Sequence, residues 1–263
     1  AAVGTGRRTQ DFVDLADDDF YSGEGSDSTI WLGGDYGAAI DIPATTPGGL
    51  DPQDPAGDPG SLDLDSLFSV ASEWGVGPNR ERVAAHREEL AGRGTAAVEY
   101  IVRNHMGTLS GLESRAIEKV FTDNCEFALE LLLEQLAIID SLPARNGGNV
   151  VYFLGKLRDE RARVPMEDIL ASPDDTLSNG MRVGLVKALG TIGSMESLPM
   201  LVSLSSDTSS RVRRQCAVAM GEIGDPEAME VLLIMAVDPE LDVRSAAERA
   251  LDLIEGALEE VGE

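Results

Sequence analysis

The chain has few of the residues from which active sites and metal centres are usually built. Its 263 residues include only two cysteines and two histidines, which are Cys125, Cys216, His86 and His105. The histidines lie on separate predicted helices with no cysteine near either, and the sequence has no Gly-rich phosphate loop or Ser-His-Asp arrangement. We expect both cysteines to be small buried residues within helices. The pattern therefore predicts no catalytic residue, no metal ion and no cofactor.

Basic residues, and lysine in particular, are also scarce. Aspartate and glutamate number 47 against 21 lysines and arginines, which gives a formal net charge of −26, and the lysines are Lys119, Lys156 and Lys187. Nucleic acids and anionic membranes are recognised by clustered basic residues. The composition therefore argues against both ligands and favours a protein partner with a basic surface. The scarcity of lysine beside many arginines and acidic residues fits either a GC-rich genome or adaptation to high salt.

Long hydrophobic runs and aromatic residues are missing as well. A helix needs about 20 apolar residues to cross a bilayer, and the longest apolar candidate, residues 127–139, is interrupted by Glu130 and Glu134. We therefore expect a soluble protein without a transmembrane segment. Only 5% of the residues are aromatic, which suits a core of leucine, alanine, valine and isoleucine between closely packed helices. Because the sequence begins with Ala1, we also expect that a leader was removed, as in an exported or organelle-imported chain.

Residues 1–62 differ in composition from the rest. Their only basic residues are Arg7 and Arg8, among many aspartates, and glycine, serine and proline occur throughout. A segment with much charge and little apolar surface does not repay the entropy of folding. We therefore predict a disordered or extended acidic arm. The arm is either a solvated linker or a binding element whose aromatic anchors for a partner are Phe12, Phe20, Tyr21, Trp31 and Tyr36.

From residue 63 the sequence has helical periodicity. Apolar residues recur at a spacing of three to four, between turns rich in glycine, asparagine, aspartate and proline. The pattern predicts an all-α domain over residues 63–263, with a short first helix near Leu64, five helical hairpins and a final helix. The helices expected after the first are residues 79–92, 94–106, 111–122, 126–141, 147–158, 163–171, 178–192, 195–205, 209–223, 226–236 and 240–257.

The C-terminal third carries a repeat with a period of 31 residues. Arg182, Arg213 and Arg244 keep this interval (213 − 182 and 244 − 213). Four further sets keep the same step: Ala188, Ala219 and Ala250; Leu189, Met220 and Leu251; Ile192, Ile223 and Ile254; and Asp207 with Asp238. Stacked copies of one unit bury a continuous core only together, and they commonly present an extended surface to other macromolecules. The repeat predicts an α-solenoid that is clearest over residues 178–257.

Small residues in each unit suit close packing and tight turns. Ala188 lies in the apolar stripe of the first helix, where its small side chain lets the adjacent helix approach closely. Gly190 and Gly193 follow near the end of that helix, and Gly221 and Gly224 occupy the same positions in the next unit. We expect these glycines at the chain reversal into the second helix.

These residues resemble a known family. Asp207…Val212-Arg213…Ala219-Met220-Gly221-Glu222-Ile223-Gly224-Asp225-Pro226 and Asp238…Val243-Arg244…Ala250-Leu251 are similar to HEAT repeats, in particular to the short bacterial type also found in phycobilisome-lyase-like proteins. The resemblance is strongest over residues 178–257 and weaker over residues 147–172. It implies a right-handed α-solenoid of HEAT-like hairpins. It also implies a structural ladder of Arg182, Arg213, Arg244, Asp207 and Asp238, in which Asp207–Arg213 and Asp238–Arg244 tie consecutive units together.

The resemblance leaves several functions open. Some members of the family attach bilins to phycobiliproteins, so one alternative is a bilin lyase or chromophore chaperone, and another is a regulatory subunit or inhibitor of an enzyme. The framework residues, however, belong to members of every activity. We therefore expect a non-enzymatic protein-binding scaffold or adaptor within a larger assembly. Its expected binding surfaces are the acidic arm and the second helices, which carry Glu196, Glu227 and Glu230.

Overall fold

The chain falls into two units, residues 1–56 and residues 57–263. The computed structural model describes residues 29–31, 39–41, 59–172 and 177–261. In the first unit it describes two short antiparallel strands, β1 (Thr29–Trp31) and β2 (Ala39–Asp41), with Ile30 opposite Ile40. The sequence analysis predicts no strand there, because three residues carry too little alternation of apolar and polar side chains to be recognised.

The described part of the second unit is an all-α solenoid of helical hairpins. Its helices are α1 (Leu64–Ala71), α2 (Arg80–Gly92), α3 (Thr95–Asn104), α4 (Gly111–Asp123), α5 (Cys125–Ala137), α6 (Ala144–Leu157), α7 (Arg163–Ala171), α8 (Asn179–Ile192), α9 (Leu198–Leu204), α10 (Ser210–Ile223), α11 (Met229–Met235) and α12 (Leu241–Val261). The predicted fold class is therefore confirmed for this unit.

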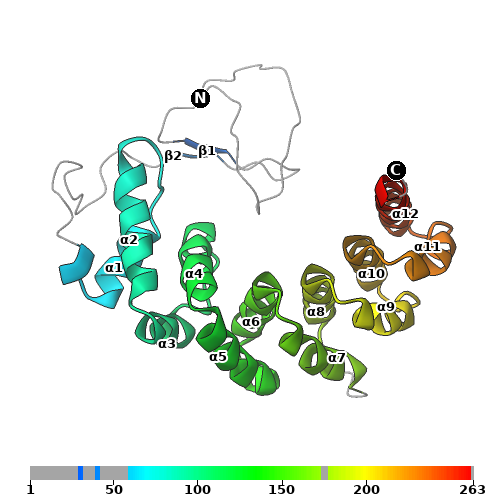
Figure 1. Cartoon of the computed structure of the whole chain (residues 1–263), viewed down its shortest axis with the longest axis horizontal. Coiled ribbons are helices and arrows are strands. Elements are labelled where there is room, and N and C mark those ends of the chain that lie inside the picture. The colour runs from blue at the N-terminus through cyan, green and yellow to red at the C-terminus, as the bar shows by residue number, and fades with distance from the viewer. Residues whose placement is uncertain (1–28, 32–38, 42–58, 173–176, 262–263) are drawn as a thin grey trace. The chain divides into compact units, whose positions relative to one another are not determined.

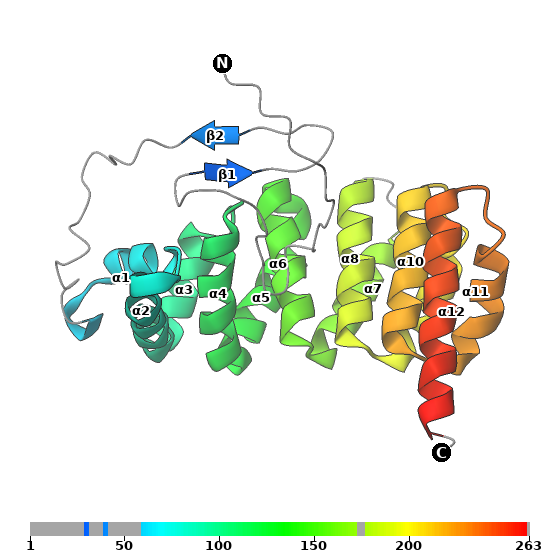
Figure 2. The same ribbon diagram turned by 90° about the horizontal axis from the view of Figure 1, so that it is seen from above.

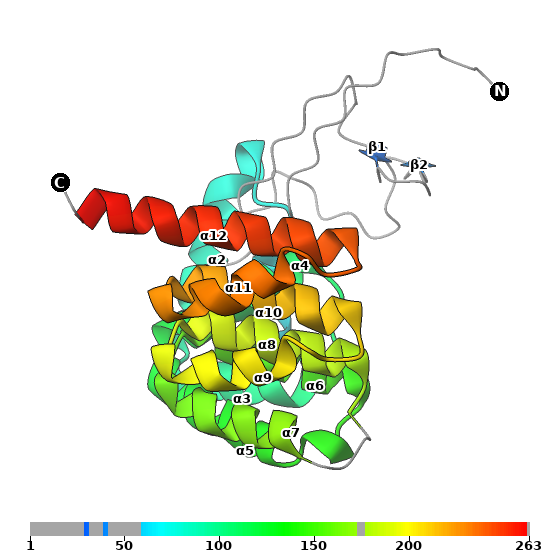
Figure 3. The same ribbon diagram turned by 90° about the vertical axis from the view of Figure 1, so that its right-hand side faces the viewer.

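The helices of the second unit form two layers (Figure 1). The first helices of the hairpins, α2, α4, α6, α8, α10 and α12, lie on the inner side of a curved row, and the second helices lie on its outer side. Neighbouring inner helices contact one another directly from α6 to α12, and Figure 2 shows α8, α10 and α12 side by side. Figure 3 shows that α12 extends beyond α10 and α11. From α6 to α12 the inner layer is thus one continuous surface of neighbouring helices.

Helix ends are set by capping residues. Ser110 and Ser178 accept hydrogen bonds from backbone N–H groups in the first turns of α4 and α8. At the other end, Gly193 and Gly224 terminate α8 and α10 with φ of 79° and 74°. Glycine adopts this left-handed conformation without the steric penalty of a Cβ atom. These two glycines make the chain reversals that the sequence predicts.

Some boundaries differ from the predicted ones. The helix α5 ends at Ala137 rather than at residue 141, and the 3-10 turn Ile139–Ser141 follows, because Leu142 is extended before Pro143. The second helices of the last two hairpins are shorter than predicted, since each begins with a 3-10 turn, Met195–Ser197 and Pro226–Ala228.

The helical unit also begins earlier than residue 63. The side chain of Arg93 donates hydrogen bonds from Nη2 to the carbonyls of Gly60 and Leu62, at 3.0 and 3.2 Å. These bonds hold the 3-10 turn Pro59–Ser61 against the end of α2. Because Arg93 is at least 31 residues away from these acceptors, no local sequence pattern indicates that the helical unit begins here.

Two glycines of the repeat allow the inner helices to touch. A Cβ atom added to Gly190 would lie 2.7 Å from Cβ of Ala219, and one added to Gly221 would lie 2.8 Å from Cβ of Ala250. Cβ atoms essentially never approach other atoms within 3.0 Å. The prediction that Gly190 and Gly221 lie at the chain reversal is therefore wrong. Both glycines lie within the helices, one turn before the reversal, and form the helix contact.

The same contact extends into the part without a clear sequence repeat. A Cβ atom on Gly155 of α6 would lie 3.0 Å from Cβ of Ala188 in α8. Gly155 precedes Gly190 by 35 residues rather than 31, so the sequence hides their equivalence. Buried apolar residues from Leu67 to Ile254 accordingly form one core that runs through all the described hairpins.

The glycine contacts predict opposite effects for two Gly-to-Ala substitutions. Gly221→Ala should lower the free energy of unfolding by about 1–3 kcal/mol, because the new methyl group forces the backbones of α10 and α12 apart. Gly256→Ala is the control, because its Cβ atom would meet no atom within 4 Å. It should raise the stability by up to about 1 kcal/mol through helix propensity. Urea denaturation of both variants would measure the difference, and two equally stabilised variants would show that the helices are not in close contact.

Candidate binding surfaces

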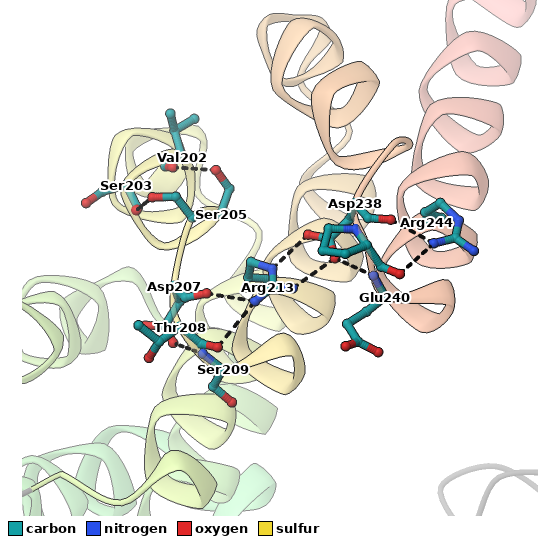
Figure 4. Close-up of polar contacts among 12 residues, drawn as sticks. Val202, Ser203, Ser205, Asp207, Thr208, Ser209, Arg213, Asp238, Glu240 and Arg244 are labelled. Atoms are coloured by element: carbon teal, nitrogen blue, oxygen red, sulfur yellow. Dashed lines mark hydrogen bonds and ion pairs between the residues drawn. The ribbon is translucent and has the colours of Figure 1, made fainter.

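Arginines of the inner helices bind aspartates one hairpin further along. Arg213 of α10 donates from Nε and Nη2 to the two carboxylate oxygens of Asp238, both at 2.8 Å (Figure 4). Arg182 of α8 forms the corresponding ion pair with Asp207. Both aspartate side chains are almost buried, with 10% of Asp238 and 4% of Asp207 exposed. Each pair therefore links an inner helix to the turn that starts the next inner helix.

The aspartates make a different contact with the arginine six residues later. Nη1 of Arg213 donates to the backbone carbonyl of Asp207 at 2.9 Å, and Nη1 of Arg244 donates to that of Asp238 at 2.7 Å. The predicted pairs Asp207–Arg213 and Asp238–Arg244 do meet, but the arginines bind the peptide oxygens of the aspartates and not their carboxylates. The carboxylates bind the arginines 25 residues earlier, a separation that spacing within one repeat does not reveal.

Each aspartate also fixes the turn in which it lies. Oδ1 of Asp207 accepts a hydrogen bond from the backbone N–H of Ser209 at 2.7 Å, and Oδ1 of Asp238 accepts one from Glu240 at 2.9 Å. The guanidinium of Arg213 lowers the pKa of Asp238, and Asp238 in turn raises the pKa of Arg213. Arg213 and Asp238 therefore stabilise each other's charged forms, and both aspartates also hold their own turns, which indicates a structural role for the ladder.

The three predicted binding glutamates lie on the outer side of the hairpins. Glu196 and Glu227 occupy the same position in the 3-10 turns that precede α9 and α11, and Glu230 lies in the first turn of α11. All three are exposed. A hydrogen bond from the hydroxyl of Ser194 to Glu196, at 2.5 Å, lowers the pKa of that glutamate. We call these three residues the acidic row.

The predicted aromatic anchors lie in the first unit. Trp31 is the last residue of β1. Phe12, Phe20, Tyr21 and Tyr36 lie outside the described residues. Their role in binding remains a prediction from the sequence.

A groove on the inner layer contains residues that the sequence analysis does not select. It has a volume of about 570 Å³ and is lined by Val183, Arg211, Arg214, Leu241, Asp242, Ser245 and Arg249. Every one of these residues comes from α8, α10 or α12. Three of the lining residues, Val183, Arg214 and Ser245, lie at intervals of 31 residues, so they occupy the same position in successive repeat units. This equivalence is hidden because the residue type changes from one unit to the next.

The two histidines and the two cysteines lie in or beside four different helices. His86 is buried in α2, and Nε2 of His105 lies 2.9 Å from the hydroxyl of Tyr100 in α3. Cys216 is buried in α10, and burial raises the pKa of its thiol to about 12. Cys125 is exposed, contrary to the expectation, because it is the first residue of α5 and precedes the buried face of that helix. Among the described residues, no three potential metal ligands gather at one place.

No helix in the part of the chain that the structure describes combines the length and the apolar character needed to span a bilayer.

Comparison of the sequence with protein families assigns the repeat. The family described as HEAT repeats matches residues 178–252, the stretch that runs from α8 into α12. Residues 178–252 are HEAT repeats. The 31-residue HEAT unit thus comprises one inner helix, the turn with its glycine and one outer helix. No curated protein sequence matches the chain.

Several solved structures resemble this chain at low sequence identity. Human deoxyhypusine hydroxylase in complex with glycerol has 18% sequence identity and a TM-score of 0.41, over 73% of this chain and 74% of that one. A designed armadillo repeat protein in complex with peptide (KR)4 has 16% identity and a TM-score of 0.42, over 73% and 100%. The complex of CpcE and CpcF of phycocyanin lyase from a Nostoc species has 19% identity and a TM-score of 0.44, over 82% of each chain. Likenesses at this level assign no function.

The ion pair of the HEAT ladder predicts a pH-dependent stability. Asp238→Asn should cost about 2 kcal/mol near neutral pH, because the Arg213 guanidinium loses its charged partner while the turn N–H keeps an acceptor. The pKa of Asp238 is lowered from 3.8 in the folded chain. Its contribution is therefore complete above that value and is lost as the pH falls through the lower folded pKa. The difference in stability between wild type and variant should shrink over that acid range in urea titrations.

Glu126→Gln is the matched control. Glu126 forms a bidentate pair with Arg161, but both side chains are more than half exposed. Solvent screens such a pair, so its loss should hardly change the stability. Equal effects of the two substitutions would mean that the ladder is no more than a surface contact.

Proposed function

We propose that the chain is a non-enzymatic scaffold or adaptor that binds protein partners within a larger assembly. The observation that carries the proposal is the array of HEAT repeats over residues 178–252, whose inner helices form a continuous surface. Stacked repeats of this kind expose large surfaces of fixed shape. The ladder of buried ion pairs supports this role, since it fixes the orientation of each hairpin relative to the next.

The acidic row is the proposed contact for a basic partner. Glu196, Glu227 and Glu230 lie on consecutive hairpins and are exposed, so they can be reached without unfolding. The net charge of −26 adds a long-range attraction for a basic protein. The aromatic residues of the first unit are proposed as additional anchors, because aromatic side chains supply a large part of the binding energy at many interfaces.

The acidic row can be tested with matched charge variants. A pull-down with the full chain followed by mass spectrometry should recover a partner in a stoichiometric complex. Replacing Glu196, Glu227 and Glu230 together by glutamine should then weaken its binding about tenfold or more, and added salt should weaken the wild-type complex. Replacing Glu81, Glu248 and Glu255 of the inner helices by glutamine changes the net charge equally and should leave affinity nearly unchanged. Equal losses of affinity in both variants would show that binding depends on the net charge and not on the position of the acidic row.

The aromatic anchors are tested by a second variant. Replacing Phe20, Tyr21, Trp31 and Tyr36 together by alanine should weaken partner binding by at least about 2 kcal/mol if one or two of them are buried in the complex. The helical circular dichroism signal should stay the same. Unchanged affinity would identify residues 1–62 as a linker. Covalent transfer of a bilin by the purified chain would overturn the non-enzymatic function.

A further inference from the structure

The groove on the inner layer has the opposite charge to the rest of the chain. Three arginines and one aspartate line it, so its lining is net positive in a chain whose net charge is −26. Arg211 and Arg214 come from α10, and Arg249 comes from the neighbouring α12. The three arginines therefore come from helices that lie on the inner side of the curved row (Figure 1).

The groove arginines are not used by the fold. Arg182 and Arg213 point to buried carboxylates and tie hairpins together. In contrast, the side chains of Arg211, Arg214 and Arg249 are exposed and, within the described residues, make no hydrogen bond or ion pair. Acidic residues outnumber basic ones by more than two to one in this chain, yet these three guanidinium groups remain without a carboxylate.

The position of two arginines is also unfavourable for the helix that carries them. Arg211 is the second residue of α10, Arg214 lies one turn further along, and the first turn contains no acidic residue. The N-terminus of a helix has a partial positive charge, so a cation there costs about 0.3–1 kcal/mol. The helices α6 and α7 likewise carry an arginine and no acidic residue in their first turns, whereas α4 and α12 have Glu113 and Asp242 there. An anion bound beside Arg211 and Arg214 would offset this cost at α10.

We propose that this groove binds an acidic peptide segment of a partner protein, with Arg211, Arg214 and Arg249 holding its carboxylates. A guanidinium group donates two parallel hydrogen bonds to a carboxylate, and such charge-assisted pairs are stronger than neutral ones. The apolar side chains of Val183 and Leu241 at the groove give the peptide a surface for a neighbouring apolar residue. The inference rests on the proposed function as a protein binder, but it uses a different surface from the acidic row and a partner segment of opposite charge.

A long polyanion fits the groove less well than a peptide. Charges beyond about 8–10 Å are screened at physiological salt, so a few carboxylates inside the groove feel mainly the three arginines. A nucleic acid would continue past the groove along a chain that carries 47 acidic residues. The positive patch spans only the neighbouring helices α10 and α12 and is therefore matched to a short acidic segment.

The helix spacing sets the expected pattern of acids. Closely packed helices lie about 8–10 Å apart, and the contact between Gly221 and Ala250 places α10 and α12 at the short end of this range. An extended peptide advances about 3.3 Å per residue. A peptide that crosses from Arg214 to Arg249 should therefore carry acidic residues two to three positions apart.

The experiment measures binding of a labelled peptide to the full chain by fluorescence anisotropy. The probe is an extended peptide of about twelve residues with glutamate at every third position and serine or glycine between, long enough to cross the groove. A peptide with glutamine in place of glutamate is the first control, and a single-stranded oligonucleotide of equal charge is the second. The glutamate peptide should bind, the glutamine peptide should not, and the oligonucleotide should bind more weakly than the glutamate peptide.

Matched arginine variants locate the site. Replacing Arg211, Arg214 and Arg249 together by glutamine should weaken peptide binding at least about tenfold. Replacing the exposed Arg80, Arg103 and Arg158 by glutamine changes the net charge equally and should leave the affinity within about twofold of wild type. Equal losses in the two variants, no binding of the glutamate peptide, or preference for the oligonucleotide would each overturn the inference. Binding of a basic partner through the acidic row would be unaffected by any of these results, so the two proposals fail separately.

Discussion

The close contact between neighbouring inner helices is the constraint on which the other features of the solenoid depend. Gly190 and Gly221 bring the following helix near enough for their backbones to touch Ala219 and Ala250. Only at this short distance does an arginine on one helix reach the turn before the next, as Arg213 reaches Asp238. The same contact brings side chains of α10 and α12 together around one groove. Packing, ion pairing and the inner surface therefore share one geometric cause.

In the ladder, a single aspartate contacts the previous inner helix, its own turn and the next inner helix. The carboxylate of Asp238 binds the arginine of the previous inner helix, its Oδ1 fixes the local turn, and its peptide oxygen receives Arg244 of the next inner helix. A charge that is almost removed from water is costly unless all its hydrogen-bonding capacity is used. All the hydrogen bonds of Asp238 can form only when two consecutive hairpins are in their correct positions. The ladder thus makes the orientation of each hairpin depend on its neighbours.

The repeat could be predicted from the sequence because it is periodic in residue type. Arginine, alanine and aspartate recur at fixed intervals, and this recurrence predicted the solenoid and the members of the ladder. The spacing of apolar residues between turn residues predicted most helix bounds. Contacts between units could not be predicted in the same way: Arg213 meets a carboxylate 25 residues on, and Gly155 is offset by 35 residues from its equivalent. The groove was missed because Arg214 is replaced by valine and serine at equivalent positions, so the property that matters there is surface charge and not sequence identity.

The glycine contacts and the ion pairs recur with the same 31-residue period. One repeat unit can therefore take the place of another. Excision of residues 194–224 would remove α9 and α10 and join α8 to the turn before α11. Gly190 would then face Ala250 in place of Ala219, and Arg182 would meet Asp238 in place of Asp207, so each lost partner is replaced by the same residue type. In evolutionary terms, recombination within this region can lengthen or shorten the array by whole hairpins without any new packing solution. The junction between α6 and α8, with its longer connection, does not share this freedom.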